Sequence, residues 1–159
     1  MSKLHSYQTE LAWKGNLGSG TSFYNSYKRD YVVRVQDKPV IEGSSDPEFR
    51  GDGSRYNPEE MLVASLSSCH MLWFLHLCAV SGIIVTAYED RAIGTMEENA
   101  DGSGSFSEVV LHPVASVSGE IDAERLDALH KEANQKCFIA NSCNFSVRHM
   151  AEYKASEGA

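Results

Sequence analysis

The sequence is poor in cysteine and proline, and it has no run of basic residues. Its 159 residues contain four Cys and four Pro and carry a net charge of −8. Four Cys are too few for a disulfide scaffold, and no apolar signal region follows the first residues, so we expect reduced thiols and a cytoplasmic protein. An acidic chain without a basic block is a poor candidate for binding nucleic acid or an anionic membrane surface.

Residues 61–80 form the one long uncharged run of the sequence. Twenty such residues are about the length that spans a bilayer. This run, however, includes three Ser and two His, and no Lys or Arg flanks it to set a membrane topology. We therefore expect a central helix buried within a globular protein, and no membrane partner.

Alternating apolar residues, turn residues and helix signals predict an α+β protein. The expected strands span residues 8–14, 21–26, 31–35, 83–95, 106–118 and 144–153, and the expected helices span residues 58–81 and begin near residue 122. The order βββ-α-ββ-α-β, with the two long strands as a hairpin, favours one domain over residues 1–159. Pro113 predicts that its strand, or that part of the strand, lies at a sheet edge.

The first helix has a well-marked start and end. Asn57 is a suitable N-cap, Pro58 suits the first helical position, and Glu60 completes a capping box. Gly82 is the expected stop. The preceding loop, residues 43–57, is long for a compact domain, and long ordered loops are often functional.

The four cysteines leave two interpretations open. Cys69 lies in the middle of the first helix, and Cys137 lies at the end of the second, on the face formed by Leu126, Leu129 and Ala133. A buried Cys often serves only as a small apolar residue, but one Cys on each helix could also form a redox couple. No Cys-x-x-Cys motif is present.

A metal site built from Cys69, His70, His76 and Cys78 is disfavoured. At 100° per residue, Cys69 and Cys78 point to opposite sides of the helix, and His70 diverges from Cys69 by about 100°. We expect no metal, and structural roles for both histidines.

The segment from Asn57 to Met71 carries the most specific pattern. It reads Asn-Pro-Glu-Glu-Met-Leu-Val-Ala, followed by Ser-Ser-Cys-His-Met, with Cys69 ten residues after Glu59. This pattern resembles the OsmC/Ohr family, the osmotically inducible protein C and organic hydroperoxide resistance proteins. A second cysteine late in the second helix is typical of that family, and Cys137 matches it. The resemblance implies an OsmC-like fold, with antiparallel sheets around two long central helices, in an intertwined homodimer.

The resemblance also implies a thiol-dependent peroxidase that reduces organic hydroperoxides to alcohols. Cys69 would form a sulfenic acid, and Cys137 would convert it to a Cys69–Cys137 disulfide. The family needs no bound cofactor. An external dithiol restores the thiols, and a dihydrolipoyl protein is the candidate suggested by the Ohr branch.

In this family an arginine, oriented by a glutamate, supports the reactive thiolate. Glu59 is the matching glutamate. Arg50 is the best positional match for the arginine, Arg29 is the alternative, and Arg55 is a third candidate. Ten residues on one helix separate Glu59 from Cys69 by about 15 Å. A shared site would therefore take Glu59 from a second chain.

Two departures from the family pattern affect the second cysteine. Phe138 stands where the family often has Pro, and Cys143 lies close enough in sequence to compete with Cys137 as the partner thiol. A second function is also compatible with the sequence: an OsmC-fold stress or binding protein without efficient turnover. A third is a membrane or partner-docking protein led by residues 61–80.

Overall fold

The computed structural model describes residues 2–156, and the chain forms two compact units. The N-terminal unit comprises Met1–Met61 and the C-terminal unit Leu62–Ala159. Helix α1 (Pro58–Val80) begins in the first unit and continues through the second.

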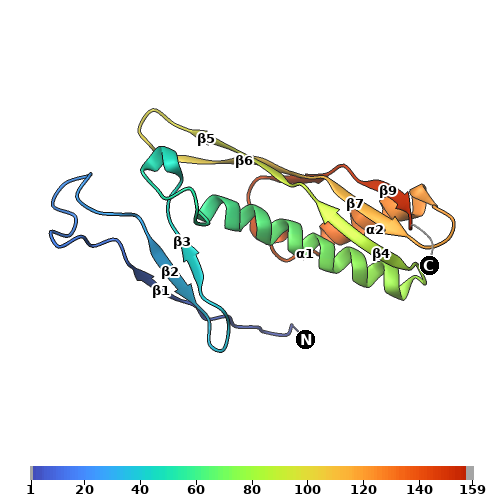
Figure 1. Ribbon diagram of the computed structural model, residues 1–159. Coiled ribbons are helices and arrows are strands. Elements are labelled where there is room, and N and C mark those ends of the chain that lie inside the picture. Colours follow the sequence, from blue (N-terminus) through green and yellow to red (C-terminus); the bar gives the residue numbers. More distant parts are fainter. Residues whose placement is uncertain (1, 157–159) are drawn as a thin grey trace. The chain divides into compact units, whose positions relative to one another are not determined.

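The N-terminal unit is built on a three-stranded antiparallel sheet. Its strands β1 (Glu10–Trp13), β2 (Tyr31–Arg34) and β3 (Ile41–Gly43) pair in the order β1-β2-β3 (Figure 1). The predicted strand over residues 21–26 is wrong, because these residues form turns. The Asn16 side chain accepts hydrogen bonds from Gly18 N (2.8 Å) and Gly20 N (3.0 Å), which bends the chain before a strand can begin.

The loop before α1 is ordered by its own hydrogen bonds. A short 3₁₀ helix, η1 (Pro47–Phe49), is capped by Asp46, whose carbonyl accepts from Phe49 N (2.9 Å) and Gly51 N (3.0 Å). Arg50 follows with φ +64°, a left-handed conformation that costs a non-glycine residue about 1–3 kcal/mol. A Cβ on Gly51 would lie 1.5 Å from Ser45 O, so this position requires glycine.

Helix α1 begins and ends where its sequence signals predict. Glu60 N donates to Asn57 Oδ1 (2.8 Å) and Asn57 N donates to Glu60 Oε2 (3.2 Å), which completes the capping box. At the other end Gly82 has φ +72°, and Ile83 N donates to Cys78 O (2.9 Å).

The C-terminal unit contains two three-stranded sheets, in the orders β4-β7-β9 (Figure 1) and β5-β6-β8. The strands are β4 (Val85–Asp90), β5 (Ile93–Glu98), β6 (Gly104–Leu111), β7 (Pro113–Val117), β8 (Ser146–His149) and β9 (Glu152–Ala155). The predicted hairpin is present, since β5 pairs with β6 and β4 with β7, all antiparallel. The final strand is split, and its two parts pair in parallel with β6 and β7.

The predicted strands over residues 83–95 and 106–118 are each interrupted, because a side-chain oxygen replaces a backbone carbonyl as the hydrogen-bond acceptor. Asp90 Oδ1 accepts from His112 N (2.7 Å), at the point where the chain passes from one sheet to the other. Pro113 is the first residue of β7, where it needs no donor, and β7 is the central strand of its sheet. The prediction of an edge strand is therefore wrong for β7 as a whole, but Pro113 itself is paired with β4 and not with β9, so this part of the strand does lie at an edge.

The core of the C-terminal unit lies between its helices and sheets. Helix α2 (Ala123–Lys136) is capped by Asp122 and buries the predicted face. One apolar cluster joins both helices to β7: Phe74, Leu77, Cys78, Ala115, Val117, Leu126, Leu129 and Ala133. A second cluster joins Leu66 to Val109 and Leu111 of β6. Among residues 2–156, α1 is the one helix long and apolar enough to cross a membrane, and its buried stripe packs into both clusters.

Candidate active site

Helix α1 holds Cys69 at the border between its buried and exposed faces. Leu66 and His70 on either side are fully buried, whereas Ser68 and Leu72 are exposed, and Cys69 itself is half-buried. The Ser67 hydroxyl donates to Asp90 Oδ2 (2.5 Å), which ties this turn of α1 to the end of β4. The backbone at Cys69 is therefore held in place, while its side chain remains partly exposed to solvent.

Cys137 caps the end of α2 and is almost completely buried, with 1% of its surface exposed. Its backbone N donates to Asn134 O (3.3 Å), and its carbonyl accepts from Asn141 N (3.0 Å). Ala140 N donates to Cys137 Sγ at 3.4 Å. The turn after α2 therefore fixes this sulfur from several sides.

The structure brings the side chains of Cys69 and Cys137 together. Burial raises the pKa of Cys137 to about 11, and a hydrogen bond to Cys69 contributes in the same direction. Both cysteines are free thiols. The two helices thus place a half-buried thiol beside a fully buried one that is kept protonated, which is an arrangement suited to disulfide formation.

The other two cysteines lie in apolar surroundings. Cys78 belongs to the core cluster between the helices, and burial raises its pKa to about 11. Cys143 is half-buried against the second apolar cluster, its thiol donates to Ile139 O (3.3 Å), and burial raises its pKa as well. Of the other three cysteines, Cys69 and not Cys143 or Cys78 contributes to the raised pKa of Cys137.

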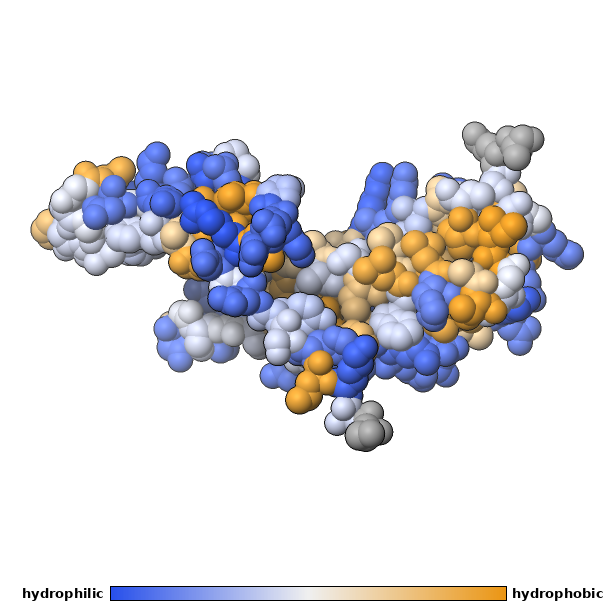
Figure 2. Space-filling view, turned by 90° about the horizontal axis from the view of Figure 1, so that it is seen from below, coloured by the Kyte–Doolittle hydropathy of each residue, from blue (hydrophilic) through white to orange (hydrophobic). Residues whose placement is uncertain are grey.

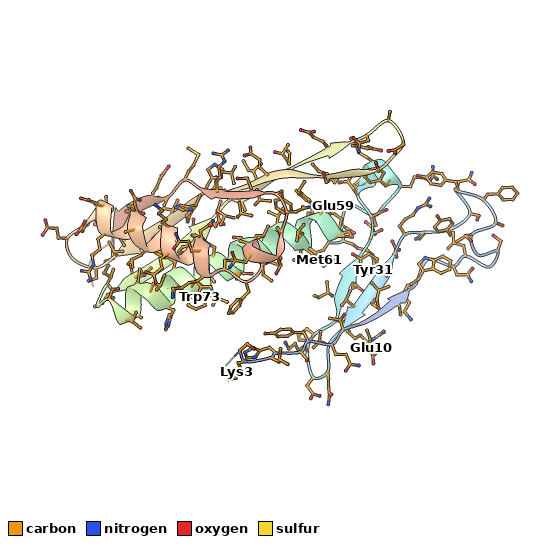
Figure 3. All side chains as sticks on the ribbon, turned by 180° about the vertical axis from the view of Figure 1, so that it is seen from behind. Lys3, Glu10, Tyr31, Glu59, Met61 and Trp73 are labelled. Atoms are coloured by element: carbon orange, nitrogen blue, oxygen red, sulfur yellow. The ribbon has the colours of Figure 1, made fainter. Side chains whose placement is uncertain are left out.

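Two aromatic side chains flank the thiol pair. Trp73 lies one turn after Cys69 on α1 (Figure 3), and Phe138 directly follows Cys137. Their rings meet edge to face with centroids 5.8 Å apart, and Lys136 Nζ lies 5.6 Å from the Trp73 ring centre. Phe138 remains 70% exposed, so the site presents an apolar wall to solvent.

All three candidate arginines belong to the N-terminal unit, and they differ in how they are engaged. Arg29 donates to the carbonyls of Tyr24 and Tyr27 (both 2.8 Å) and stacks over both rings. Arg55 is shared among three carboxylates, those of Asp30, Glu42 and Asp52, at 3.4–4.0 Å. Arg50 contacts the Tyr24 ring at 5.7 Å and has no ion pair among residues 2–156. Of the three candidates, Arg50 thus has the fewest interactions with other polar or charged groups.

Glu59 lies in the first turn of α1 (Figure 3), and the helix runs without a break from there past Cys69. Burial and the charge of Glu59 raise the pKa of Tyr31, whose hydroxyl is buried without a partner among residues 2–156. The unbroken helix agrees with the premise that Glu59 does not reach its own Cys69.

One group of polar residues near the thiols was not predicted. His70, His130 and His149 meet in the interior behind Cys69. A signal exists in hindsight: His70 occupies the helical positions between Leu66 and Phe74, and His130 lies one turn after Leu126, so both fall on buried faces. Within residues 2–156 no group of three or more His, Cys, Asp or Glu is arranged to hold a metal ion.

Known proteins share both sequence and fold with this chain. A family model described as OsmC-like protein matches residues 51–150. An OsmC-like protein of unknown function from Vibrio cholerae O1 biovar eltor is similar at 30% identity with a TM-score of 0.85, over 93% of this chain and 99% of that one.

More distant structures share the fold alone. An organic hydroperoxide resistance protein from Elizabethkingia anophelis is 17% identical with a TM-score of 0.73, over 97% of this chain and 100% of that one. A putative organic hydroperoxide resistance protein from V. cholerae, with captopril bound in one of the active sites, is 21% identical with a TM-score of 0.65, over 96% and 94% of the two chains. No curated protein matches the chain. The family match over residues 51–150 and the 30% identical structure show that the chain belongs to the OsmC-like protein family, with its α+β fold.

Proposed function

We propose that this protein is a thiol-dependent peroxidase that reduces organic hydroperoxides to alcohols. The observation that carries the proposal is that the half-buried Cys69 lies beside the buried Cys137, whose pKa it helps to raise. Relatives of the same fold that are named as organic hydroperoxide resistance proteins support the same chemistry.

The reaction balances with these two residues and a dithiol. The Cys69 thiolate attacks the outer oxygen of the hydroperoxide, the O–O bond breaks, and the alkoxide takes a proton and leaves as an alcohol. Cys69 is then a sulfenic acid. The Cys137 sulfur attacks it, the S–S bond forms, and the hydroxyl leaves with the Cys137 proton as water. An external dithiol reduces the disulfide by exchange and is itself oxidised.

The surroundings of the two thiols suit two different roles, one as the nucleophile and one as the thiol that forms the disulfide. Because the pKa of Cys137 is raised to about 11, Cys137 stays a protonated thiol until the sulfenic acid forms beside it. Cys69 is the more exposed of the two residues and is the nucleophile. Its thiolate needs a nearby cation, and we assign that role to Arg50, with Glu59 orienting the guanidinium. Arg29 and Arg55 are already engaged by carbonyls, rings and carboxylates.

The aromatic wall favours an organic substrate over hydrogen peroxide. Trp73 and Phe138 offer apolar surface next to the reactive sulfur, and the organic group of a hydroperoxide would cover it. We propose no bound cofactor, a cytoplasmic location, and a small or protein dithiol such as a dihydrolipoyl protein as the reductant.

We also propose that the protein acts as a homodimer. Among the described residues of the N-terminal unit, Val32 is the one buried hydrophobic side chain, and three strands without a core are not stable alone. Only 28% of the most apolar stretch of α1 is buried within one chain, and its exposed side chains include Leu72 and Val80. Apolar side chains gather on one face of the C-terminal unit (Figure 2). A second copy would cover these surfaces.

The test follows single thiols through one turnover. Wild type mixed with one equivalent of cumene hydroperoxide should lose the Cys69 and Cys137 thiols together and form one disulfide, as read by mass spectrometry. Cys69→Ser should consume no hydroperoxide. Cys137→Ser should consume one equivalent and stop at a sulfenic acid that dimedone traps, whereas the matched control Cys143→Ser should turn over within about twofold of wild type.

Two results would count against the proposal. If wild type with a dithiol consumed hydroperoxide no faster than Cys69→Ser, the alternative of a stress or binding protein without turnover would stand. If Cys143→Ser, rather than Cys137→Ser, stopped at the sulfenic acid, Cys143 would be the resolving thiol.

Arg29 is expected to be structural. Replacing it with Ala removes two hydrogen bonds and two ring contacts, so Arg29→Ala should lower the free energy of unfolding by about 1–2 kcal/mol. The rate of hydroperoxide consumption at saturating dithiol should remain within about threefold of wild type. A variant with wild-type stability and no activity would instead make Arg29 the catalytic arginine.

A further inference from the structure

Three histidines from three different elements meet in the core of the C-terminal unit. His70 of α1 and His130 of α2 are 1% and 0% exposed, and His149 ends β8. His70 Nε2 and His130 Nδ1 are 2.8 Å apart, a hydrogen bond between two imidazoles. His149 lies with its ring centre 5.4 Å from that of His70 and 5.6 Å from that of His130. We call these residues the histidine cluster.

The contacts between α1 and α2 define a fixed antiparallel register. Arg125 donates to Ser81 O (2.7 Å) at one end, and the Cys69–Cys137 pair lies at the other. Between them His130 stacks on Phe74, with ring centres 3.7 Å apart, and bonds to His70. As residue numbers fall along α1 they rise along α2, so a slide of one helix changes all of these contacts at once.

Of the two hydrogen bonds that link α2 to α1 or to Ser81 directly after it, the His70–His130 bond is the one nearer to the thiols. The other side chains between the helices, such as Leu77, Leu129 and Ala133, are apolar and tolerate small shifts. A hydrogen bond loses its strength within a few tenths of an ångström and a few tens of degrees. A shift of α1 by one residue moves Cys69 by about 1.5 Å and turns it by about 100°.

We propose that the His70–His130 hydrogen bond is a positioning element for the thiol pair: it sets the register of α1 against α2 and so keeps Cys69 within reach of Cys137. The inference rests on the proposed function. It assigns the bond to the second step, disulfide formation, and not to the attack on the hydroperoxide. His70 adjoins Cys69 in sequence but faces the core, so it acts through the helix and does not contact the reacting atoms.

The chemistry of the bond suggests how to imitate and how to remove it. Two neutral imidazoles form it with one donor and one acceptor nitrogen. The amide of Gln reaches about as far as Nε2 and that of Asn about as far as Nδ1, so His70→Gln/His130→Asn keeps a hydrogen bond at this place. His70→Phe/His130→Phe keeps two stacked rings without it, and replacing both partners with apolar groups leaves no buried polar group unpaired.

The experiment compares these two double variants with wild type in each half-reaction. Both variants should consume the first equivalent of cumene hydroperoxide within about twofold of the wild-type rate. In the Phe/Phe variant the Cys69–Cys137 disulfide should form at least about tenfold more slowly, and Cys69 sulfinic acid should accumulate under excess hydroperoxide. In the Gln/Asn variant disulfide formation should return to within about threefold of wild type.

A matched control separates positioning from a general loss of stability. Tyr153→Phe removes the hydrogen bond from Tyr153 to Asp127 (2.5 Å) beside His130, and it should leave both half-reactions unchanged. Oxidation by diamide in place of hydroperoxide gives the same comparison of disulfide rates without any peroxidase step. A wild type that forms the disulfide with diamide but consumes no hydroperoxide would end the proposed function alone.

Three outcomes would overturn the positioning role. They are a Phe/Phe variant that forms the disulfide at the wild-type rate, one in which both half-reactions slow by the same factor, and a Gln/Asn variant as slow as Phe/Phe. If neither double variant folds, the single variant His130→Asn is compared with wild type. A rate of disulfide formation below one-tenth of the wild-type rate supports the positioning role, and an unchanged rate rejects it.

Discussion

Two inactive variants, Cys69→Ser and Arg50→Gly, are expected to restore peroxidase activity when they are combined in mixed dimers. Glu59 and Arg50 belong to the same unit of the chain, and Glu59 lies about 15 Å along α1 from its own Cys69. If Glu59 orients Arg50, both reach the thiol of the partner chain. A mixed dimer then contains one complete site, with Cys69 from one chain and Arg50 from the other.

The choice of Arg50→Gly follows from the backbone. Arg50 has φ +64°, which glycine adopts without strain, so the loop should keep its shape while the cation is lost. With random exchange, half of the dimers are mixed and half of their sites are complete, so about a quarter of wild-type activity should return. Dual affinity tags on the two chains would isolate the mixed species for the measurement.

The reciprocal pairing provides the control. Wild type paired with the double variant Cys69→Ser/Arg50→Gly should be inactive as a mixed dimer, because each of its sites lacks one of the two groups. If that dimer instead kept half of the wild-type activity while the first mixture stayed inactive, Arg50 would serve the cysteine of its own chain. Monomers in light scattering at working concentration would remove the basis for a shared site.

Local signals predicted α1 well because its determinants lie within a few residues of one another. The Asn57–Glu60 capping box and the left-handed Gly82 are both observed where the sequence places them. Strand boundaries were predicted less well. The break between β6 and β7 depends on Asp90, whose bond to His112 N spans 22 residues, and no local pattern encodes it.

The residues of the candidate site likewise fall into those that local sequence patterns identify and those that only the tertiary structure identifies. Cys69 and Cys137 could be singled out from motif and helix position, and the two are close enough for Cys69 to help raise the pKa of Cys137. The histidine cluster could not, because it depends on the register between two helices that are separated by about 40 residues of sheet. The choice among arginines also needed tertiary structure, since the carboxylates around Arg55 come from separate parts of the N-terminal unit.

Mild acid is expected to destabilise the protein through the histidine cluster. Burial lowers the pKa of His70 to about 4 and that of His130 to about 3, and it also lowers the pKa of His149. In the unfolded chain each histidine titrates near its usual value of about 6.5. The unfolded chain therefore binds more protons than the folded one below that pH, and the free energy of unfolding should fall as the pH drops from about 6.5 towards 4.

The other groups around the cluster do not cancel this trend. Burial raises the pKa of Tyr88, Tyr153 and Cys78, so these stay neutral throughout the window, and the Asp127 carboxylate favours a proton on His149 only as a secondary effect. Asp52 and Asp101 have lowered pKa values, so their contribution is lost below about 3.8, outside the window.

Urea unfolding at fixed protein concentration, followed by circular dichroism between pH 7 and pH 4.5, measures the effect. Two buried histidines that gain protons on unfolding contribute about 3 kcal/mol per pH unit once the pH is well below 6.5, which is a large part of a typical total stability. His70→Phe/His130→Phe should remove most of this slope, whereas His76→Gln, which changes an exposed histidine on the same helix, should retain it. A double variant that keeps the full wild-type slope would place the acid-sensitive groups elsewhere in the chain.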